Sequence, residues 1–143
     1  MIVATILAAK GRDVVTTQPY RTLAEAAALL TLRKIGAAVV TDAQGQILGM
    51  LSERDILRAV GKGGAAALDD AVSKHMTTEV LTTHEDETVD RTMEKMTVRR
   101  CRHLPVVEGG KLSGLVSIGD VVKHRLEQLE HEHQALREYI ATA

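Results

Sequence analysis

The sequence RHLPVVEGGKLSGLVSIGD, residues 102–120, determines how the rest of the chain is interpreted. It predicts one strand over Leu104–Val107, a tight turn at two glycines and a second strand over Leu112–Val116. Ser117 then precedes Asp120 by three positions. This spacing is typical of the first turn of a helix, where both side chains can accept hydrogen bonds from free backbone amides. The stretch therefore predicts a β-hairpin followed directly by a helix.

The same pattern occurs earlier, as GAAVVTDAQGQILGMLSERD at residues 36–55, so the chain contains an internal duplication. Val80-Leu81-Thr82-Thr83 matches Val14-Val15-Thr16-Thr17 at an offset of 66 positions. After the hairpin turn the offset falls to 65, so the second hairpin is one residue shorter. Because a single unit of this kind leaves one face of its sheet uncovered, we expect the two units to pack against each other.

Each copy is expected to follow the order β-α-β-β-α. The predicted fold class is therefore α/β (α+β), with two repeats packed as a pseudo-two-fold pair and a long C-terminal helix. In the first copy, Thr22 and Glu25 have capping-box spacing at the start of a helix over residues 23–34, and Gly36 is expected to end it. A short helix over residues 2–9, ended by Gly11, is expected to pack on the domain that follows it.

The expected organisation is an N-terminal lead-in (1–13), a first repeat (14–64), a linker (65–75), a second repeat (76–126) and a C-terminal helical extension (127–143). The first repeat is expected to end in a helix over residues 55–60. Gly61-Lys62-Gly63-Gly64 lacks the spacing and the Ser or Thr of a phosphate-binding P-loop, so it is interpreted as a turn.

Apolar positions along the last helix step alternately by four and three residues, as in a coiled coil. They are Val122, Leu126, Leu129, Leu136 and Ile140, and His133 occupies the remaining position of the same spacing. A tail helix folded onto its own domain would also account for them. We favour a contact between two copies in a homodimer, because soluble oligomers are most often two-fold dimers.

The composition excludes several classes of partner. With 18 basic and 19 acidic residues and a net charge of −1, nothing indicates binding to nucleic acid or to an anionic membrane. The absence of Phe and Trp argues against base stacking. One cysteine suits a reducing compartment, and no leader-like or membrane-spanning run is found. We therefore expect a cytoplasmic protein.

Both copies contain Gly-apolar-apolar-Ser-x-x-Asp directly after the hairpin, over Gly49–Asp55 and Gly114–Asp120. With Leu104–Val107 and Val72–Thr77, this signature resembles the cystathionine-β-synthase (CBS) domain, and the pair resembles a Bateman module of two such domains. The resemblance covers residues 14 to about 126. It implies a regulatory, non-enzymatic unit that binds an adenosine compound such as AMP, ADP, ATP, S-adenosylmethionine or NAD(H). With no effector domain attached, it also implies an effector protein in trans.

The resemblance implies roles for both signatures. Ser52 and Ser117, at the start of a helix, can meet a phosphate, and Asp55 and Asp120 can accept hydrogen bonds from ribose hydroxyls. Helix capping alone would also explain both pairs, and it is compatible with binding. The adenine walls implied by the family are Thr17, Thr83, Gly36, Ala37, Ala38, Arg102, His103, Leu104 and Pro105. Since the first copy offers Gly-Ala-Ala where the second offers Arg-His-Leu, we expect inequivalent sites, which one ligand such as a dinucleotide could span.

Basic residues cluster between the second helix and the second hairpin. They are Lys95, Arg99, Arg100, Arg102 and His103. Arg99 and Arg100 have two equally good explanations. They could interact favourably with the negative end of the helix dipole at the C-terminus of the preceding helix, or they could bind phosphate. Arg102 and Arg54 are the favoured phosphate contacts. In the second copy Gly119 takes the place of Arg54. The second signature therefore lacks the guanidinium group that would bind a phosphate at the first.

Two other functions stay open: a ligand-free interaction and dimerisation scaffold, and a redox or metal sensor that uses Cys101 and His103. Basic neighbours could lower the pKa of Cys101. The last helix carries His124, His131 and His133 without carboxylates or cysteines at metal-ligand spacing, so they are interpreted as solvated. Neither a metal site nor a catalytic trio is expected.

Overall fold

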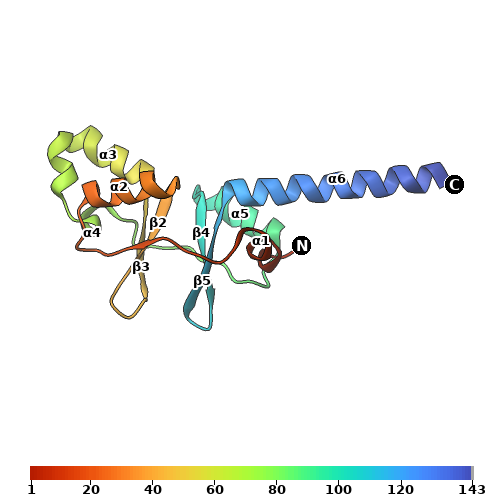
Figure 1. Cartoon of the computed structure of the whole chain (residues 1–143), viewed down its shortest axis with the longest axis horizontal. Coiled ribbons are helices and arrows are strands. Elements are labelled where there is room, and N and C mark those ends of the chain that lie inside the picture. Colours follow the sequence, from red (N-terminus) through yellow and green to blue (C-terminus); the bar gives the residue numbers. More distant parts are fainter. Residues whose placement is uncertain (143) are drawn as a thin grey trace.

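The computed structural model describes residues 1–142 as two α/β halves side by side, and a long helix projects from the second half (Figure 1). The first half holds β1 (Thr16–Thr17), α2 (Leu23–Arg33), β2 (Ala37–Thr41), β3 (Ile47–Ser52) and α3 (Glu53–Gly63). The second holds α5 (Val89–Arg99), β4 (His103–Glu108), β5 (Lys111–Ser117) and α6 (Ile118–Thr142). The remaining elements are α1 (Val3–Lys10), the 3-10 helix η1 (Gly64–Asp69) and α4 (Val72–His75). The predicted mixed α/β pair with a long last helix is confirmed.

The two sheets are not equal. In the first half β1 pairs parallel to β2, which pairs antiparallel to β3, whereas the second half has only β4 and β5. The strand expected over residues 80–83 is reduced to one bridge between Thr83 and Val106. In the first half the Val39 amide donates to the Val15 carbonyl at 3.1 Å. The matching residue of β4 is Pro105, which has no N–H to donate, so the parallel pairing stops one bond earlier.

The predicted capping box of α2 is confirmed, because Thr22 and Glu25 each accept a hydrogen bond from the other's backbone amide. The prediction that Gly36 ends this helix is wrong. Lys34 ends it in the left-handed conformation, at φ 55°, and Arg100 ends α5 in the same way at φ 52°. The predicted turn over residues 61–64 is also wrong, because α3 continues to Gly63 before Gly64 caps it.

The segment that precedes each repeat packs on the other half. Helix α1 was expected to cover the domain that follows it, but it lies in the second half instead (Figure 1). There the Val3 amide donates to the Glu87 carbonyl at 2.9 Å, and buried Leu7 packs against the core. The expected linker over residues 65–75 is ordered, since η1 and α4 place Ala67 and Val72 in the core of the first half. The core of the second half therefore needs α1, which precedes the first repeat, and the core of the first half needs η1 and α4, which precede the second repeat.

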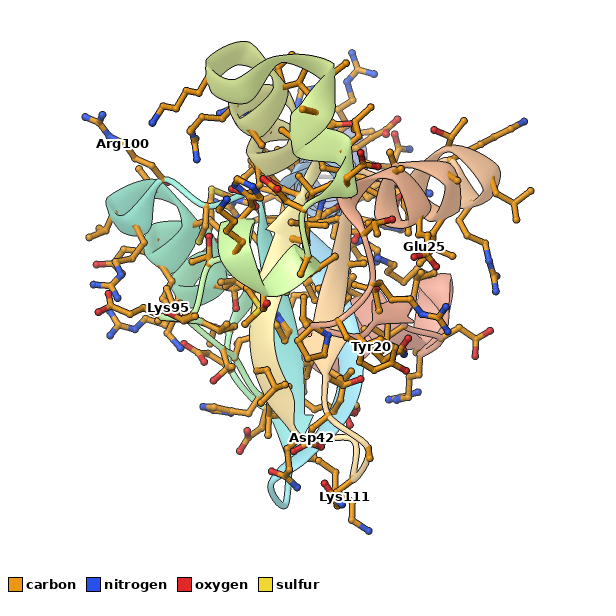
Figure 2. The ribbon with its side chains drawn as sticks, turned by 90° about the vertical axis from the view of Figure 1, so that its left-hand side faces the viewer. Tyr20, Glu25, Asp42, Lys95, Arg100 and Lys111 are labelled. Carbon is orange, nitrogen blue, oxygen red and sulfur yellow. The ribbon has the colours of Figure 1, made fainter. Side chains whose placement is uncertain are left out.

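A buried ion pair lies inside the second half, where Figure 2 labels Lys95 on α5. The side chain of Glu87 is 8% exposed, and its Oε2 atom accepts hydrogen bonds from Lys95 Nζ at 2.8 Å and from the Thr83 hydroxyl at 2.9 Å. Burial alone would raise the pKa of Glu87, but these two hydrogen bonds outweigh it and hold the pKa below the ordinary 4.5. Lys95 therefore stabilises the fold and does not belong to a phosphate-binding cluster.

Helix α6 contacts the second half only near its start. Val121 and His124 are buried, and the helix then extends away from both halves (Figure 1). The alternative of a tail folded onto its own domain is therefore wrong. His131 and His133 are exposed as predicted, but His124 is not solvated, because it is buried against the second half, where its Nδ1 lies 3.2 Å from the Asp120 carbonyl. Within residues 1–142, no helix is both long and apolar enough to cross a membrane.

Candidate functional site

A cavity of about 400 Å³ lies between the two halves, in the size range of small-molecule sites. The first half contributes Gly36, Ala37, Met50, Ser52, Glu53, Arg54, Asp55 and Arg58. The second contributes Thr77, Glu79, Val80, Leu81 and the run Arg99–His103. A molecule bound in this cavity would touch both halves at once.

The junction between β3 and α3 forms the floor of the cavity. Ser52 caps α3, since its hydroxyl accepts from the Asp55 amide at 3.3 Å. In return, Asp55 Oδ2 accepts from the Ser52 amide at 2.8 Å and from its hydroxyl at 3.1 Å. Asp55 Oδ1 contacts only Arg58, at 3.4 Å, among the side chains of residues 1–142. The capping interpretation is therefore correct, and it leaves one carboxylate oxygen able to accept further hydrogen bonds.

The segment Thr77–Leu81 forms a wall because it pairs with the edge of β3. Met50 and Thr77 exchange two backbone hydrogen bonds of 2.9 Å. A Cβ atom added at Gly49 would lie 2.6 Å from the Thr77 carbonyl oxygen and 2.9 Å from Met76 Sδ. The first glycine of the signature is thus required by a close backbone approach that builds one wall of the cavity.

Positive charge dominates the rim of this cavity. Its lining includes Arg54, Arg58, Arg99, Arg100 and Arg102 but only three carboxylates. Arg58 lies near Asp55, whereas the other four guanidinium groups form no ion pair with any residue in the described part of the chain. Figure 2 shows the Arg100 side chain projecting outward from the end of α5. These exposed donors suit a phosphorylated ligand, because guanidinium binds phosphate through paired hydrogen bonds.

His103, at the start of β4, is half-buried beside Gly36 and Glu53. Burial, and then the positive charge of Lys10, lower the pKa of His103 below its usual 6.5. The imidazole is therefore neutral at pH 7 and offers one donor and one acceptor to the cavity. It adds no positive charge to the arginine rim.

The second junction has the same capping geometry but a different occupant. The Ser117 hydroxyl caps α6 at 3.1 Å, and Asp120 Oδ2 accepts from the Ser117 amide at 2.9 Å. Lys10 Nζ lies 2.6 Å from that same Asp120 oxygen and 2.9 Å from the Leu115 carbonyl. Burial opposes ionisation, but the bonds from Lys10 and Ser117 hold the pKa of Asp120 below its usual value. The two junctions are therefore chemically different.

The structure brings half of the expected site residues together. Those that line the cavity are Gly36, Ala37, Ser52, Arg54, Asp55, Arg102 and His103. Ser117 and Asp120 lie at the second junction. The others are buried within the two sheets or their edges, where side chains pack in the core: Thr17, Ala38, Thr83, Leu104 and Pro105.

Sequence reasoning did not single out several of the lining residues as ligand contacts. They are Met50, Glu53, Arg58, Thr77, Glu79, Val80 and Leu81. Arg58 follows Asp55 by three residues in α3, so its nearness to Asp55 was readable from the helix period. The wall Thr77–Leu81 had no local signal, because its position depends on pairing with a strand more than twenty residues earlier.

Cys101 lines the cavity but is not an activated thiol. Burial raises its pKa, and a backbone hydrogen bond and Arg99 offset this only in part. The expectation of a lowered pKa is therefore wrong, since desolvation outweighs the basic neighbours. Residues 1–142 also contain no group of three His, Cys, Asp or Glu side chains that could hold a metal ion.

We expect Cys101 to react with iodoacetamide at pH 7.5 more slowly than free cysteine, because less of the thiol is ionised and part of it is covered. Mass spectrometry of the alkylated protein over time would measure the rate. Unfolding in guanidinium chloride should restore the rate of free cysteine. A native rate above that of free cysteine would support the redox alternative.

An α/β pair with a ligand-sized cavity between its halves and a capped Ser-x-x-Asp at each junction defines the class of a tandem ligand-binding module. The family model for the CBS domain matches residues 9–62 and 71–127. The chain therefore belongs to the CBS domain family and carries two tandem copies.

Curated relatives agree with this assignment. The chain is 32% identical over 115 residues to the CBS domain-containing protein YhcV of Bacillus subtilis, covering 80% of both proteins. It is 35% identical over 123 residues to the mitochondrial CBS domain-containing protein CBSX3 of Arabidopsis thaliana, covering 83% of this chain. Here it spans only 60% of the plant protein's length.

Solved structures show the same fold. The CBS-domain containing protein ATU1752 from Agrobacterium tumefaciens is 50% identical and superposes with a TM-score of 0.86, covering 87% of this chain and 99% of that one. The CBS domain pair of protein MJ0100, solved in complex with 5′-methylthioadenosine and S-adenosyl-L-methionine, is 26% identical with a TM-score of 0.80, covering 90% and 98%. A regulatory ligand-binding module is the class of function that these relatives support.

Proposed function

We propose that this protein is a regulatory module that binds a phosphorylated adenosine compound, AMP, ADP, ATP or NAD(H), in the cavity between its halves. The observation that carries the proposal is the meeting of Asp55 with the unpaired arginines in one cavity. The module has no catalytic activity and acts in the cytoplasm by signalling to an effector protein in trans. The ligand state is transmitted because the cavity joins the start of α3 to the start of β4.

Each part of a nucleotide has a counterpart among the residues that line the cavity. Asp55 Oδ1 accepts the ribose hydroxyls, since a carboxylate makes strong, charge-assisted hydrogen bonds. The aliphatic side chains of Met50, Val80 and Leu81 cover the adenine ring. The arginine rim holds the phosphates. MJ0100 was solved with adenosine compounds that lack phosphate. The arginines here favour an anionic ligand over a neutral or cationic one.

Titration calorimetry with AMP, ATP, NADH and unphosphorylated adenosine tests this function. We expect at least one phosphorylated compound to bind below millimolar concentration and adenosine to bind more weakly. Asp55→Asn should weaken binding about 30-fold, because a charge-assisted hydrogen bond contributes about 2 kcal/mol. Asp120→Asn should have a smaller effect, because Lys10 already occupies that carboxylate.

Exposed Asp69, which lies outside the cavity, is a matched control for the loss of one negative charge. Asp69→Asn should bind as the parent does. The proposed function is wrong if no compound binds below millimolar concentration, or if Asp55→Asn and Asp69→Asn bind alike. Thermal unfolding of each variant separates a loss of binding from a loss of fold.

A ligand-free scaffold is the second candidate, and the exposed length of α6 favours it. A bound ligand at a hundred times its Kd stabilises the folded state by about 2.7 kcal/mol. A thermal shift panel of nucleotides would therefore stay flat for a scaffold and rise for a sensor.

A further inference from the structure

Helix α6 carries an apolar seam that residues 1–142 leave uncovered. The seam consists of Val122, Leu126, Leu129, His133, Leu136 and Ile140. Leu126 is 61% exposed and Ile140 is 66% exposed. From the first to the last of these residues the seam is about 27 Å long, at 1.5 Å per residue. Burying an apolar stripe of this kind against a second surface is favourable, so we expect the seam to be an interaction surface.

The seam lies to one side of the protein's own contacts. Val121 and His124 face the second half. At about 100° per residue, the seam is centred more than a quarter of a turn away from these two residues. A second helix can therefore lie along α6 without displacing the buried side chains of Val121 and His124. Figure 1 shows that the outer part of α6 has no neighbouring element that would obstruct it.

We propose that two copies of this chain pair along the seam as a parallel, two-stranded coiled coil. Leu126, His133 and Ile140 then occupy the first core position of the heptad, and the other seam residues occupy the fourth. In a parallel coiled coil, the g residue of one helix, which directly precedes an a position, lies near an e residue of the partner helix. The sequence number of that e residue is higher by five. Glu132 therefore meets the partner's Arg137, and Arg125 meets the partner's Glu130. Both pairs are attractive, and each occurs twice by symmetry.

Charge also distinguishes the parallel arrangement from the antiparallel one. If the helices ran in opposite directions about His133, Glu132 would face the partner's Glu132, and like charges would repel. Arg125 already donates to Gln128 at 3.2 Å and lies 3.8 Å from Asp90 of its own chain. Its side chain is therefore only partly available for a pair with the partner's Glu130. Glu132 and Arg137 are both exposed on the outer part of the helix, and Glu132 accepts only a long hydrogen bond of 3.5 Å from Gln128, so their pair is the decisive one.

His133 sits at a first core position, where every other seam residue is aliphatic. A single polar residue at such a position restricts register, because a shifted pairing would place it against an aliphatic side chain. In the parallel arrangement the two His133 rings face each other. The proposal concerns α6 alone and does not depend on nucleotide binding.

Sedimentation velocity on the full chain, over the micromolar to near-millimolar range, tests the pairing. We expect a reversible dimer. Arg137→Glu should raise its dissociation constant about tenfold or more, because two attractive pairs become repulsive. Combining Glu132→Arg with Arg137→Glu should restore the parent value within a few-fold. Glu127→Arg, on the outer face of the helix, is the matched control and should leave the dimer unchanged.

Disulfide trapping tests the direction of the helices. In a Cys101→Ser background, Leu129→Cys and Leu136→Cys should each form a disulfide-linked dimer on their own under mild oxidation. An antiparallel pair about His133 would hold the two copies of each introduced cysteine about 9 Å or more apart along the axis, so neither variant would be trapped on its own. A chain that stays monomeric at every concentration, no disulfide from either single variant, or a failed charge swap would each overturn the proposal. A monomer would leave a helix of another protein as the alternative occupant of the seam.

Discussion

Lys95→Met is expected to destabilise the folded protein by about 3 kcal/mol, because it removes the nearest counter-charge of the buried Glu87 carboxylate and leaves Arg91 Nε, at 3.9 Å, as the remaining guanidinium partner. Glu87 is 8% exposed and Lys95 is 21% exposed, so water replaces little of the lost interaction. Lys95 Nζ also donates to the Thr82 carbonyl at 3.2 Å, and methionine cannot replace that bond. Chemical denaturation at pH 7 measures the loss.

The effect should depend on pH in a defined direction. The folded-state pKa of Glu87 lies below its ordinary value of 4.5, so its ion pair contributes fully above pH 4.5. The contribution is lost as the pH falls through the lower, folded-state value. In Lys95→Met the buried carboxylate favours protonation instead. The difference in stability between the two proteins should therefore shrink as the pH falls, first through the raised folded-state pKa of the variant and then through the lowered one of the parent.

Lys62→Met is the matched control, because Lys62 is an exposed lysine in the last turn of α3. It should change the free energy of unfolding by no more than about 0.5 kcal/mol. A loss below about 1 kcal/mol in Lys95→Met, or a loss that does not vary with pH, would show that the pair is not a buried ion pair.

Gly49→Ala has the other large expected effect, a destabilisation of about 3 kcal/mol from overpacking. The new Cβ atom would lie 2.6 Å from the Thr77 carbonyl oxygen, and a backbone atom cannot move aside as a side chain can. The two hydrogen bonds between Met50 and Thr77 would be strained. Because Thr77 lines the cavity, we also expect weaker nucleotide binding.

Gly61→Ala provides the comparison for Gly49→Ala. Gly61 lies inside α3 with nothing within 4 Å of an added Cβ atom, so alanine should stabilise the protein by about 0.5–1 kcal/mol. Gly114→Ala should fall between the two, because its Cβ atom would meet the side chain of Leu7 at 2.8 Å rather than a backbone atom. Equal stability of the Gly49 and Gly61 variants would contradict this account of the signature glycine.

Part of the candidate site follows from local chemistry, which is why the sequence predicts it. Ser52 and Asp55 are three residues apart, and their hydrogen bonds form within one turn of helix. The same holds for Ser117 and Asp120. The duplication repeats this unit, so the two junctions and their hairpins are predictable without knowledge of any distant contact.

The first repeat does not predict the buried pair in the second. At the offset of 66, the residue that matches Lys95 is Leu29, and the residue that matches Glu87 is Arg21. Their sequence positions place Lys95 among other basic residues, where a phosphate role was a reasonable expectation. Only the packing of α5 against the loop before it shows that this ammonium group is committed to Glu87.

The sequence by itself determined the duplicated β-α-β-β-α order, the capped junctions and the heptad seam, because each depends on residues close together in the chain. Tertiary structure alone decided that α1 covers the second half, that Thr77–Leu81 walls the cavity and that Lys10 occupies Asp120. These features join residues far apart in sequence, and many pairings satisfy the same local preferences. The choice among them is made by which surfaces can be buried together without leaving a polar group unpaired.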